Sequence, residues 1–369
     1  MVRTSRILTY VSLAVGVFLT FSVTGCGRKT VSPTVKIGVL LPLTGPSANQ
    51  GQDALNGLNM KLDEIKTRQG LGIKLVVEDD QSDPKTGLSA FQKLASVDRV
   101  PAVIGPISSP VVLAISSQAE RSNIVIVAIG ASSPTISQAG DYIFRHCLLA
   151  ERQAIEIARY CSEKLGSPKV GFLYINDETG MGYVNAFRRE YKRLGGRIVA
   201  EETFDRGARD YRTQLIKLKA AGAEVLFSPG IPTSTGYILR QSADIGYRCK
   251  VLAGYGVEGQ DVITIAGSEA ERLIYTSFPY DASFTRLYQK RYGKQPSASA
   301  GLAYDALGMV ADCLAKGERN GTQIRDYLYS VNNYTGVTGK ISFDRNGDTQ
   351  KEPIVFYTVK AGKFTALSK

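Results

Sequence analysis

The chain has 369 residues, of which 43% are hydrophobic and 21% charged, a globular composition with enough length for two hydrophobic cores. It contains one histidine, His146, and no tryptophan, so a histidine-rich metal site is excluded and a Ser/His/Asp triad would depend on that imidazole. The formal net charge is +11, but no RRM, zinc-finger or Arg-rich run accompanies it. We therefore expect a solvated basic surface and no nucleic-acid partner.

The N-terminus has the pattern of an export signal. Arg3 and Arg6 precede the apolar run "ILTYVSLAVGVFLTFSV", and the small residues of "VTGC" end it. This pattern predicts a secretory signal peptide over residues 1–25. An uncleaved membrane anchor is the alternative, because the apolar run approaches spanning length. The boundary resembles a bacterial lipobox, which implies acylation of Cys26, a lipidated tether over 26–34 and an exported protein anchored to the cell envelope.

Strand and helix patterns alternate after the tether. "TVKIGVLLPL" predicts a buried strand, "ANQGQDALNGLNMKLDEIK" an amphipathic helix and "IKLVVEDD" a second strand. Asp83 and Pro84 predict the cap and first residue of the next helix. A strand ending at Ile104, a helix after Pro110 and the strand "IVIVAIG" follow. This alternation predicts a parallel, doubly wound sheet with right-handed crossovers.

The stretch "AVIGPISSPVVLAIS" joins the strand that ends at Ile104 to its helix and contains a pair of serines. Ser108 or Ser109 lies at the cap position, and Pro110 is expected at the first helical position. A plain helix cap is one interpretation. The other is an anion site, because free N–H groups, a hydroxyl and the positive end of the helix dipole meet there.

The pattern restarts with the helix "ERQAIEIARYCSEKLG" and predicts a second doubly wound domain. The tail alternates at period two around Asn346-Gly347 and Ala361-Gly362, which predicts hairpin strands. "DRNGD" is interpreted as a turn rather than a calcium loop, since no glutamate follows at the EF-hand position. The remaining cysteines form no CxxC, so metal is not expected, and their pairing is open: Cys147, Cys161, Cys249 and Cys313.

Ligand sites in open α/β sheets lie beyond the carboxyl ends of the strands. The loops expected there are rich in Gly, Ser and Thr and poor in His, Cys and paired carboxylates. Such loops hydrogen-bond a ligand but offer little acid, base or nucleophile, so the residues favour a non-catalytic binder without a cofactor. These loops are Thr44–Gly51, Gly105–Ser109, Gly130–Ser133, Asn176–Met181, Gly230–Thr233 and Gly254–Glu258.

Phrases such as "KIGVLLPLTGPSANQGQDALNGLNMKLDEI" and "GLAYDALGMVADCLAKG" resemble class I solute-binding proteins of bacterial ABC importers, in the leucine/isoleucine/valine-binding subfamily. The resemblance covers Val35 to Phe364. It implies an α/β fold of two doubly wound parallel-sheet lobes, a small-molecule ligand, an ABC permease partner and a monomer. The implied N-terminal lobe is 35–145 plus 279–340, and the C-terminal lobe is 146–278 plus 341–369. Three hinge crossovers are placed near Phe144–Leu148, Thr276–Tyr280 and Lys340–Phe343.

The resemblance also implies a site. Ser109, beside Ile107, falls on the serine that holds the ligand's carboxylate, and Gly130 and Ser132 fall on the backbone and hydroxyl positions of the following loop. Gln50, Met181 and Ile231 occupy positions that are aromatic in amino-acid binders. The acidic partner of the ligand's ammonium aligns with Gly256, beside Tyr255, unless the alignment shifts by two residues to Glu258. Carboxylate recognition is therefore expected, and recognition of an α-amino group is left open.

Two other functions are compatible with the sequence. A sensor on the same fold would signal ligand binding, although no receptor transmembrane helix or kinase follows in this chain. An enzyme would have to use His146, which is expected at a crossover in a structural role.

Overall fold

The computed structural model describes residues 34–69, 71–166, 169–350 and 353–367, so the predicted signal peptide and Cys26 lie outside the described residues. The described chain forms one parallel sheet of five strands, ordered β2-β1-β3-β4-β5. The order reverses once, which is the doubly wound pattern that the sequence predicts. The elements of this first half are β1 (Val35–Leu41), α1 (Ala48–Gln69), β2 (Ile73–Asp79), α2 (Pro84–Lys93), η1 (Leu94–Asp98), β3 (Ala102–Ile104), α3 (Ser109–Ser122), β4 (Val125–Ala128), η2 (Pro134–Gln138) and β5 (Ile143–Arg145).

A second sheet of seven strands in the described residues has the order β14-β13-β10-β9-β8-β6-β7. Strands β6 to β10 are parallel, and the last two are antiparallel. The remaining elements are α4 (Ala150–Glu163), β6 (Lys169–Ile175), α5 (Glu178–Arg193), β7 (Arg197–Phe204), α6 (Arg212–Ala220), β8 (Val225–Phe227), α7 (Pro232–Asp244), β9 (Lys250–Ala253), η3 (Tyr255–Val257), α8 (Gln260–Ala266), η4 (Gly267–Arg272), β10 (Leu273–Ser277), α9 (Ala282–Tyr292), α10 (Ala298–Ala315), α11 (Gly321–Ser330), β11 (Tyr334–Gly336), β12 (Gly339–Ile341), β13 (Val355–Lys360) and β14 (Lys363–Ala366).

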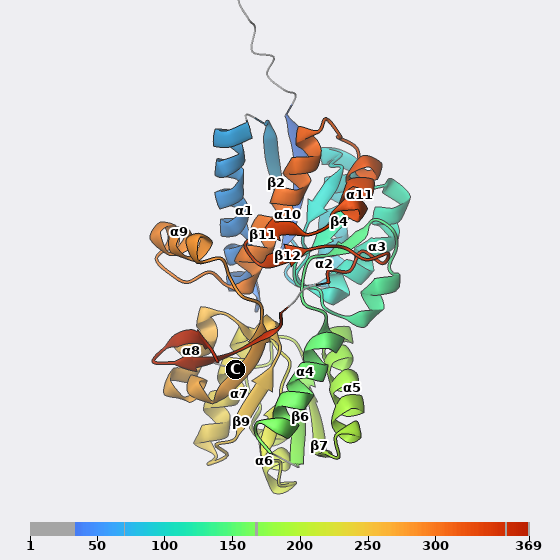
Figure 1. The fold of residues 1–369 in the computed structure, drawn as a ribbon. Coiled ribbons are helices and arrows are strands. Elements are labelled where there is room, and N and C mark those ends of the chain that lie inside the picture. The colour runs from blue at the N-terminus through green and yellow to red at the C-terminus, as the bar shows by residue number, and fades with distance from the viewer. Residues whose placement is uncertain (1–33, 70, 167–168, 351–352, 368–369) are drawn as a thin grey trace, which may run out of the picture. The chain divides into compact units, whose positions relative to one another are not determined.

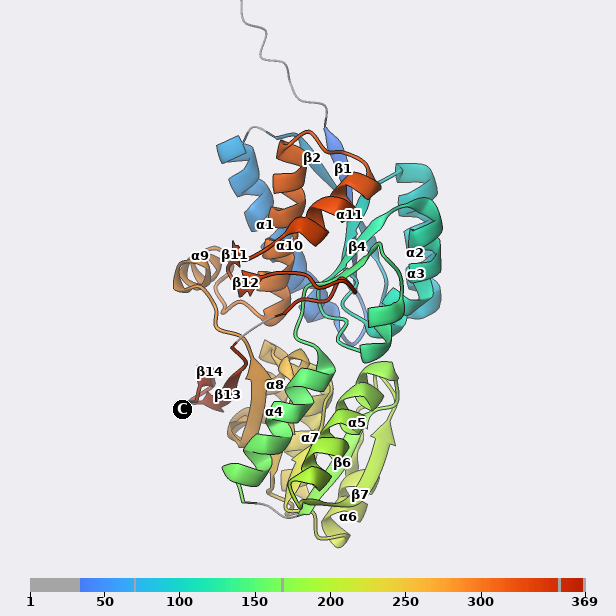
Figure 2. The ribbon, with the colours of Figure 1, turned by 45° about the vertical axis from the view of Figure 1, so that its right-hand side comes forward.

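Helices cover both faces of each sheet, which explains the unbroken apolar strands. In β1, Ile37 and Val39 pack into the core beneath α1, α10 and α11, whereas Leu40 packs into the core beneath α2 and α3. Figures 1 and 2 show α1 and α10 side by side on the first of these faces. The second sheet is enclosed in the same way by α4 and α5 on one face and α6, α7 and α8 on the other. The two-lobed α/β class that the sequence predicts is confirmed.

The chain passes between the lobes near two of the predicted positions. Strand β5 of the first sheet ends at Arg145, and α4 of the second lobe begins at Ala150. Strand β10 of the second sheet ends at Ser277, and α9 packs beside α1 and α10. His146 is buried at the first passage, with Nε2 3.6 Å from Asp305 Oδ2. This contact joins the first passage to α10 of the first lobe.

The third passage lies later in the chain than Lys340–Phe343, so that prediction is wrong. Phe343 packs into the core of the first lobe, and Asp348 forms a backbone bridge with Arg145. Arg145 Nε donates a hydrogen bond to Asp348 Oδ1 at 2.6 Å, and both side chains are buried. The buried pair keeps residues 341–349 on the first lobe, and the chain reaches the second sheet only at β13.

The two predicted tail turns differ in outcome. Ala361-Gly362 closes the hairpin of β13 and β14, with Lys360 opposite Lys363, as predicted. Asn346-Gly347 forms a turn in which Gly347 N–H donates to Asp344 at 3.0 Å. Only one bridge, Phe343 to Thr349, flanks that turn, because the following strand pairs with β10 instead.

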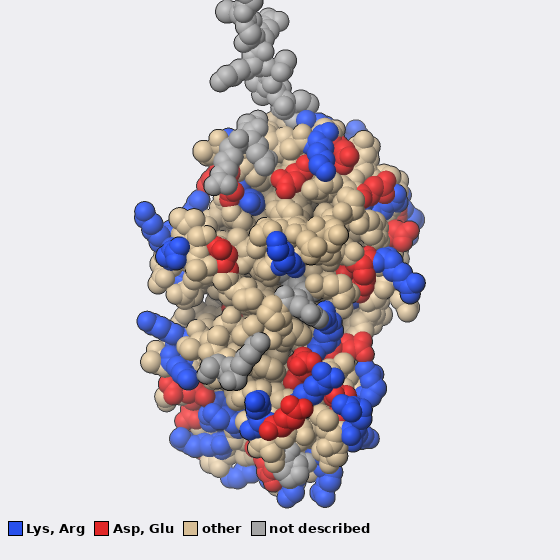
Figure 3. Space-filling view, viewed as in Figure 1, with Lys and Arg blue, Asp and Glu red and all other residues tan. Residues whose placement is uncertain are grey.

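No cluster of three or more His, Cys, Asp or Glu among the described residues could hold a metal ion, and none of the described helices is long and apolar enough to cross a bilayer. Cys147, Cys161, Cys249 and Cys313 are buried and form no disulfide. On the face drawn in Figure 3, Lys and Arg are interspersed with Asp and Glu, as expected of a solvated surface.

Candidate functional site

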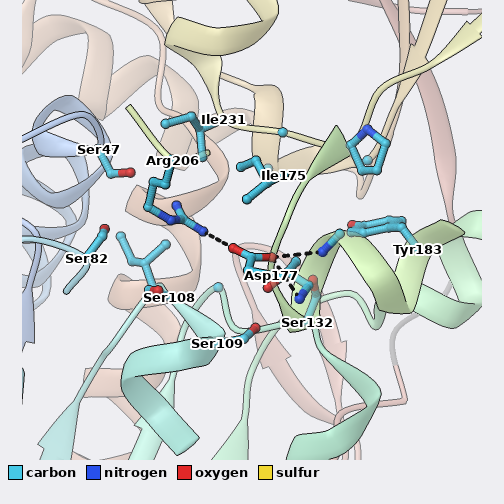
Figure 4. Close-up of a pocket in the computed structure, with 18 of the residues that line it drawn as sticks. Ser47, Ser82, Ser108, Ser109, Ser132, Ile175, Asp177, Tyr183, Arg206 and Ile231 are labelled. Atoms are coloured by element: carbon cyan, nitrogen blue, oxygen red, sulfur yellow. Dashed lines mark hydrogen bonds and ion pairs between the residues drawn. The ribbon is translucent and has the colours of Figure 1, made fainter. Parts of the chain in front are cut away.

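A cavity of about 60 Å³ lies between the lobes, at the carboxyl ends of strands from both sheets. This volume is several times the roughly 10–15 Å³ that one water molecule requires. Figure 4 shows its principal side chains. The cavity is lined by Ser47, Gln50, Ser82, Ile107, Ser108, Ser109, Gly130 and Ser132 of the first lobe and by Ile175, Asp177, Thr179, Gly180, Tyr183, Arg206, Pro229, Gly230, Ile231, Gly254, Tyr255 and Gly256 of the second.

Hydrogen bonds join the lobes around this cavity. Gln50 Nε2 donates to the carbonyl of Gly256 at 2.9 Å, and the Tyr255 hydroxyl donates to the carbonyl of Gly130 at 2.9 Å. Asn49 Nδ2 donates to Asp261 Oδ1 at 2.7 Å. Gln50 and Tyr255, both predicted ligand residues, therefore also connect the two lobes in a closed arrangement.

The serine loop approaches the cavity through a close turn. Gly105 has φ +98° and passes so near β1 that a Cβ would lie 2.0 Å from the carbonyl oxygen of Leu40. Only glycine fits there without strain. The turn delivers Ser108 and Ser109 to the cavity lining at the N-terminus of α3.

The two serines do not cap α3 with their hydroxyls. Ser108 is the N-cap residue but its side chain makes no capping hydrogen bond, and Pro110 is the second helical residue rather than the first. The buried Ser108 Oγ has no hydrogen-bond partner among the described residues. Ser109 Oγ accepts a hydrogen bond from Ser133 N–H at 3.2 Å. This arrangement favours the anion-site hypothesis over the plain cap, and ligand binding by Ser109 stays a prediction.

Ser132 and Gly130 line the cavity beside the serine loop. A Cβ on Gly130 would lie 2.6 Å from Ile107 Cγ2, so the two loops pack tightly. The Ser132 side chain hydrogen-bonds the buried Tyr183 hydroxyl; burial raises the pKa of Tyr183, and this hydrogen bond lowers it in part. Tyr183 is therefore a neutral phenol that positions Ser132.

Met181 does not reach the cavity, contrary to the expectation from alignment. Helix α5 buries Gly180, Tyr183, Val184 and Phe187, which share one face at helical spacing. Met181 lies off that face, is 43% exposed and lines a separate surface hollow. The helical phase thus places Tyr183 in the cavity, and the same periodicity in the sequence could have identified it. Ile231 and Ile107 do line the cavity.

Glu258 is also absent from the cavity lining. Its carboxylate accepts hydrogen bonds from Ser277 Oγ at 3.0 Å and from the Tyr280 hydroxyl at 2.8 Å. Burial raises the pKa of Glu258 to about 7. The hydrogen bonds from Tyr280 and Ser277 lower this pKa in part, and the negative charge of Asp53 raises it further. Glu258 therefore ties its loop to the second passage between the lobes, outside the cavity lining.

Two charged residues in the cavity were missed at the sequence level. Asp177 caps α5, with Oδ1 accepting from the N–H groups of Thr179 at 3.0 Å and Gly180 at 2.9 Å. Arg206 follows β7 and donates from Nη2 to Asp177 Oδ2 at 2.7 Å, as Figure 4 shows. The connection after "RIVAEETF" follows a predicted strand, so the strand-end rule could have included Arg206.

Two α/β lobes that close over a cavity of mixed polar and apolar lining define a protein that binds a small solute between its lobes. The class also accounts for the lining, which contains no arrangement of nucleophile and base among the described residues.

The chain belongs to the periplasmic binding protein family, whose model, described as "Periplasmic binding protein", matches residues 34–363. It is 28% identical over 340 residues to "Leu/Ile/Val-binding protein homolog 2" of Brucella abortus, covering 89% of this chain and 91% of that protein. The leucine-binding protein LivK of Thermotoga maritima has a TM-score of 0.85 at 26% identity, covering 91% of this chain and 98% of that one.

A further structural relative is the branched-chain amino acid transporter substrate-binding protein LivJ of Streptococcus pneumoniae, solved in complex with isoleucine. Its TM-score is 0.85 at 29% identity, covering 90% of this chain and 99% of that one. The predicted class I, leucine/isoleucine/valine-binding type is thereby confirmed. These proteins are solute-binding proteins rather than enzymes.

Proposed function

We propose that the chain is the extracytoplasmic, lipid-anchored substrate-binding protein of an ABC importer, and that it binds a small carboxylate-bearing solute between its lobes. The observation that carries the proposal is the interlobe cavity, where Ser109, Ser132 and the N-terminus of α3 come together. Hydroxyls and free N–H groups at a helix start stabilise a carboxylate. The protein would act as a monomer that presents the solute to its permease.

The relatives support transport as the role. The Streptococcus pneumoniae relative is a transporter substrate-binding protein, and membership of the periplasmic binding protein family implies export. A thermal-shift screen of amino acids, keto acids, aromatic acids and amides tests the proposal. A ligand present at 100 times its Kd adds about 2.7 kcal/mol of stability. If no carboxylate in such a screen shifts the transition, the proposed function is wrong.

Ser109→Ala is expected to weaken binding of any carboxylate found in that screen by roughly 10- to 100-fold, because a charge-assisted hydrogen bond contributes about 1.5–3 kcal/mol. Calorimetric titration with the acid and with its amide measures the effect, which should be much smaller for the amide. Ser116→Ala is the matched control, because Ser116 Oγ bonds the Leu113 carbonyl within the same helix and does not line the cavity. If the parent protein and Ser109→Ala bind the acid with equal affinity, Ser109 does not bind its carboxylate.

Cys26→Ser is expected to release the protein from membranes into the soluble envelope fraction, because acyl chains on Cys26 would be its anchor. Fractionation of cells expressing the two forms, followed by a salt wash, measures the release. A Cys26→Ser protein that still pellets with membranes would rule out the lipoprotein assignment and favour the uncleaved anchor.

A further inference from the structure

The charges of the cavity are already paired with each other. Among the described residues that line it, Asp177 is the carboxylate and Arg206 the guanidinium. Asp177 Oδ2 accepts from Arg206, and Oδ1 accepts the two N–H groups at the start of α5. Both oxygens of the carboxylate are therefore engaged inside the protein.

This pairing leaves the described lining without a carboxylate charge that is not already balanced by a cation, so an ammonium group of the ligand would add an unbalanced positive charge. A buried ammonium without a carboxylate partner is costly. Glu258 is held by Ser277 and Tyr280 outside the lining. Asp80 is fully buried and also outside the lining; its Oδ1 accepts from Ser82 N–H at 2.7 Å, and its Oδ2 has no hydrogen-bond partner among the described residues. The nearby carbonyl of Gly130 accepts from Tyr255.

Hydrogen-bond donors, by contrast, remain at one end of the cavity. The bond to Asp177 uses one of the five N–H donors of a guanidinium, and Arg206 is 23% exposed at the cavity lining. The Ser108 hydroxyl is buried without a partner among the described residues. Ser47 and Ser82 line the same cavity, and Figure 4 draws their hydroxyls with Ser108 around Arg206.

Two observations bring the connection that carries Arg206 in the second lobe close to these serines of the first lobe. A Cβ on Gly207, the next residue, would lie 3.4 Å from Pro46 Cγ, and Pro46 precedes Ser47. The positive charge of Arg206 also acts on Asp80, which holds the Ser82 backbone. We call Arg206, Ser47, Ser82 and Ser108 the Arg206 pole. It is rich in donors and lies at the lobe interface.

We propose that the cavity selects a small organic anion that lacks an α-ammonium group, and that the Arg206 pole binds an oxygen of the anion's second polar end. The inference rests on the proposed function and names its substrate class. Ser109 and Ser132 hold one carboxylate, the isoleucines contact the carbon chain between the two ends, and Arg206 donates to the distal oxygen. Planar guanidinium N–H groups suit a distal carboxylate or carbonyl.

Calorimetric titration of four acids against the full chain in detergent tests the two parts of the proposal separately, namely the missing α-ammonium group and the distal oxygen at the Arg206 pole. 2-Oxoglutarate and glutamate differ in the α-group, as do 4-methyl-2-oxopentanoate and leucine, and each pair differs from the other at the distal end. We expect 2-oxoglutarate to bind at least about 10-fold more tightly than glutamate and than 4-methyl-2-oxopentanoate, the effect of one charge-assisted hydrogen bond or one unpaired charge.

Arg206→Gln should weaken 2-oxoglutarate by roughly 10- to 100-fold and change 4-methyl-2-oxopentanoate less than about threefold. Arg209→Gln is the matched control, because Arg209 lies on the same connection but outside the lining, and it should change neither affinity. Glutamate or leucine binding as tightly as its oxo partner would overturn the inference and leave the proposed function standing. If acids of the wider screen bind but none of these four does, the inference is also overturned and the proposed function stands. If no acid of the wider screen binds, both fail.

Discussion

Asp348→Ala should lower the free energy of unfolding by about 3–5 kcal/mol, because it leaves the buried Arg145 guanidinium without its carboxylate. Arg145 is 1% exposed, and its side chain also bonds Ser133 and Ser137 around Asp348. The pair ties the end of β5 to the turn at residues 344–348, 203 positions further on. Urea unfolding of both proteins measures the difference.

Asp326→Ala provides the control for this variant. Asp326 pairs with Arg325 at 2.7 Å, but its side chain is 61% exposed. Pairs of this kind contribute about 0–1 kcal/mol. If Asp348→Ala is no more destabilising than Asp326→Ala, the buried pair does not anchor the tail segment to the first lobe.

Glu258→Gln should remove about 3 kcal/mol from the pH dependence of stability of the parent protein. Burial raises the pKa of Glu258 from 4.5 to about 7, so the folded state holds a proton that the unfolded state has lost between these values. The contribution of Glu258 to stability is therefore fully present below pH 4.5 and lost as the pH rises through 7. Asp80, whose pKa burial raises to about 6, adds a dependence of the same sign that both proteins keep.

The measurement is the change in unfolding free energy between pH 5 and pH 8, made on the parent and on the variant. The cost of fitting an amide between Ser277 and Tyr280 is the same at both pH values, so it cancels in this difference. The parent should lose more stability than Glu258→Gln over this range. The exposed Glu178→Gln serves as a surface control. Identical losses in parent and Glu258→Gln would mean that Glu258 is not a buried carboxyl.

Local patterns predict the elements well where neighbouring residues suffice to define them. Asp83 caps α2 by accepting from Thr86 N–H at 2.8 Å, with Pro84 as the first helical residue, as the sequence indicates. The apolar run of β1 predicts a strand covered on both faces, which the two cores confirm. Strand ends also bring Ser109 and Ser132 to one cavity. The helix start and the strand depend on periodicity and capping chemistry alone, whereas the resemblance to solute-binding proteins indicated Ser109 and Ser132.

The errors arise where distant residues decide. The third passage depends on the pairing of Asp348 with Arg145, which no local pattern reveals. Glu258 is drawn out of the cavity by Ser277 and Tyr280, on a segment about 20 residues later whose proximity follows from tertiary packing. The position of Met181 was taken from alignment, although the helical face shared by Gly180, Tyr183 and Val184 predicts otherwise. Arg206 lies after the predicted strand "RIVAEETF", in a connection that carries four charged residues and was not among the loops expected at the site.

The central claim is that a carboxylate binds between the lobes at Ser109 and Ser132, and a crystal structure of the protein with the acid that stabilises it most tests this directly. We expect one carboxylate within hydrogen-bonding distance, about 2.5–3.0 Å, of both hydroxyls, in a cavity closed by the bonds of Gln50 and Tyr255 across the lobes. An acid bound in the outer hollow beside Met181, or in the cavity with its carboxylate turned away from both serines, would contradict the account.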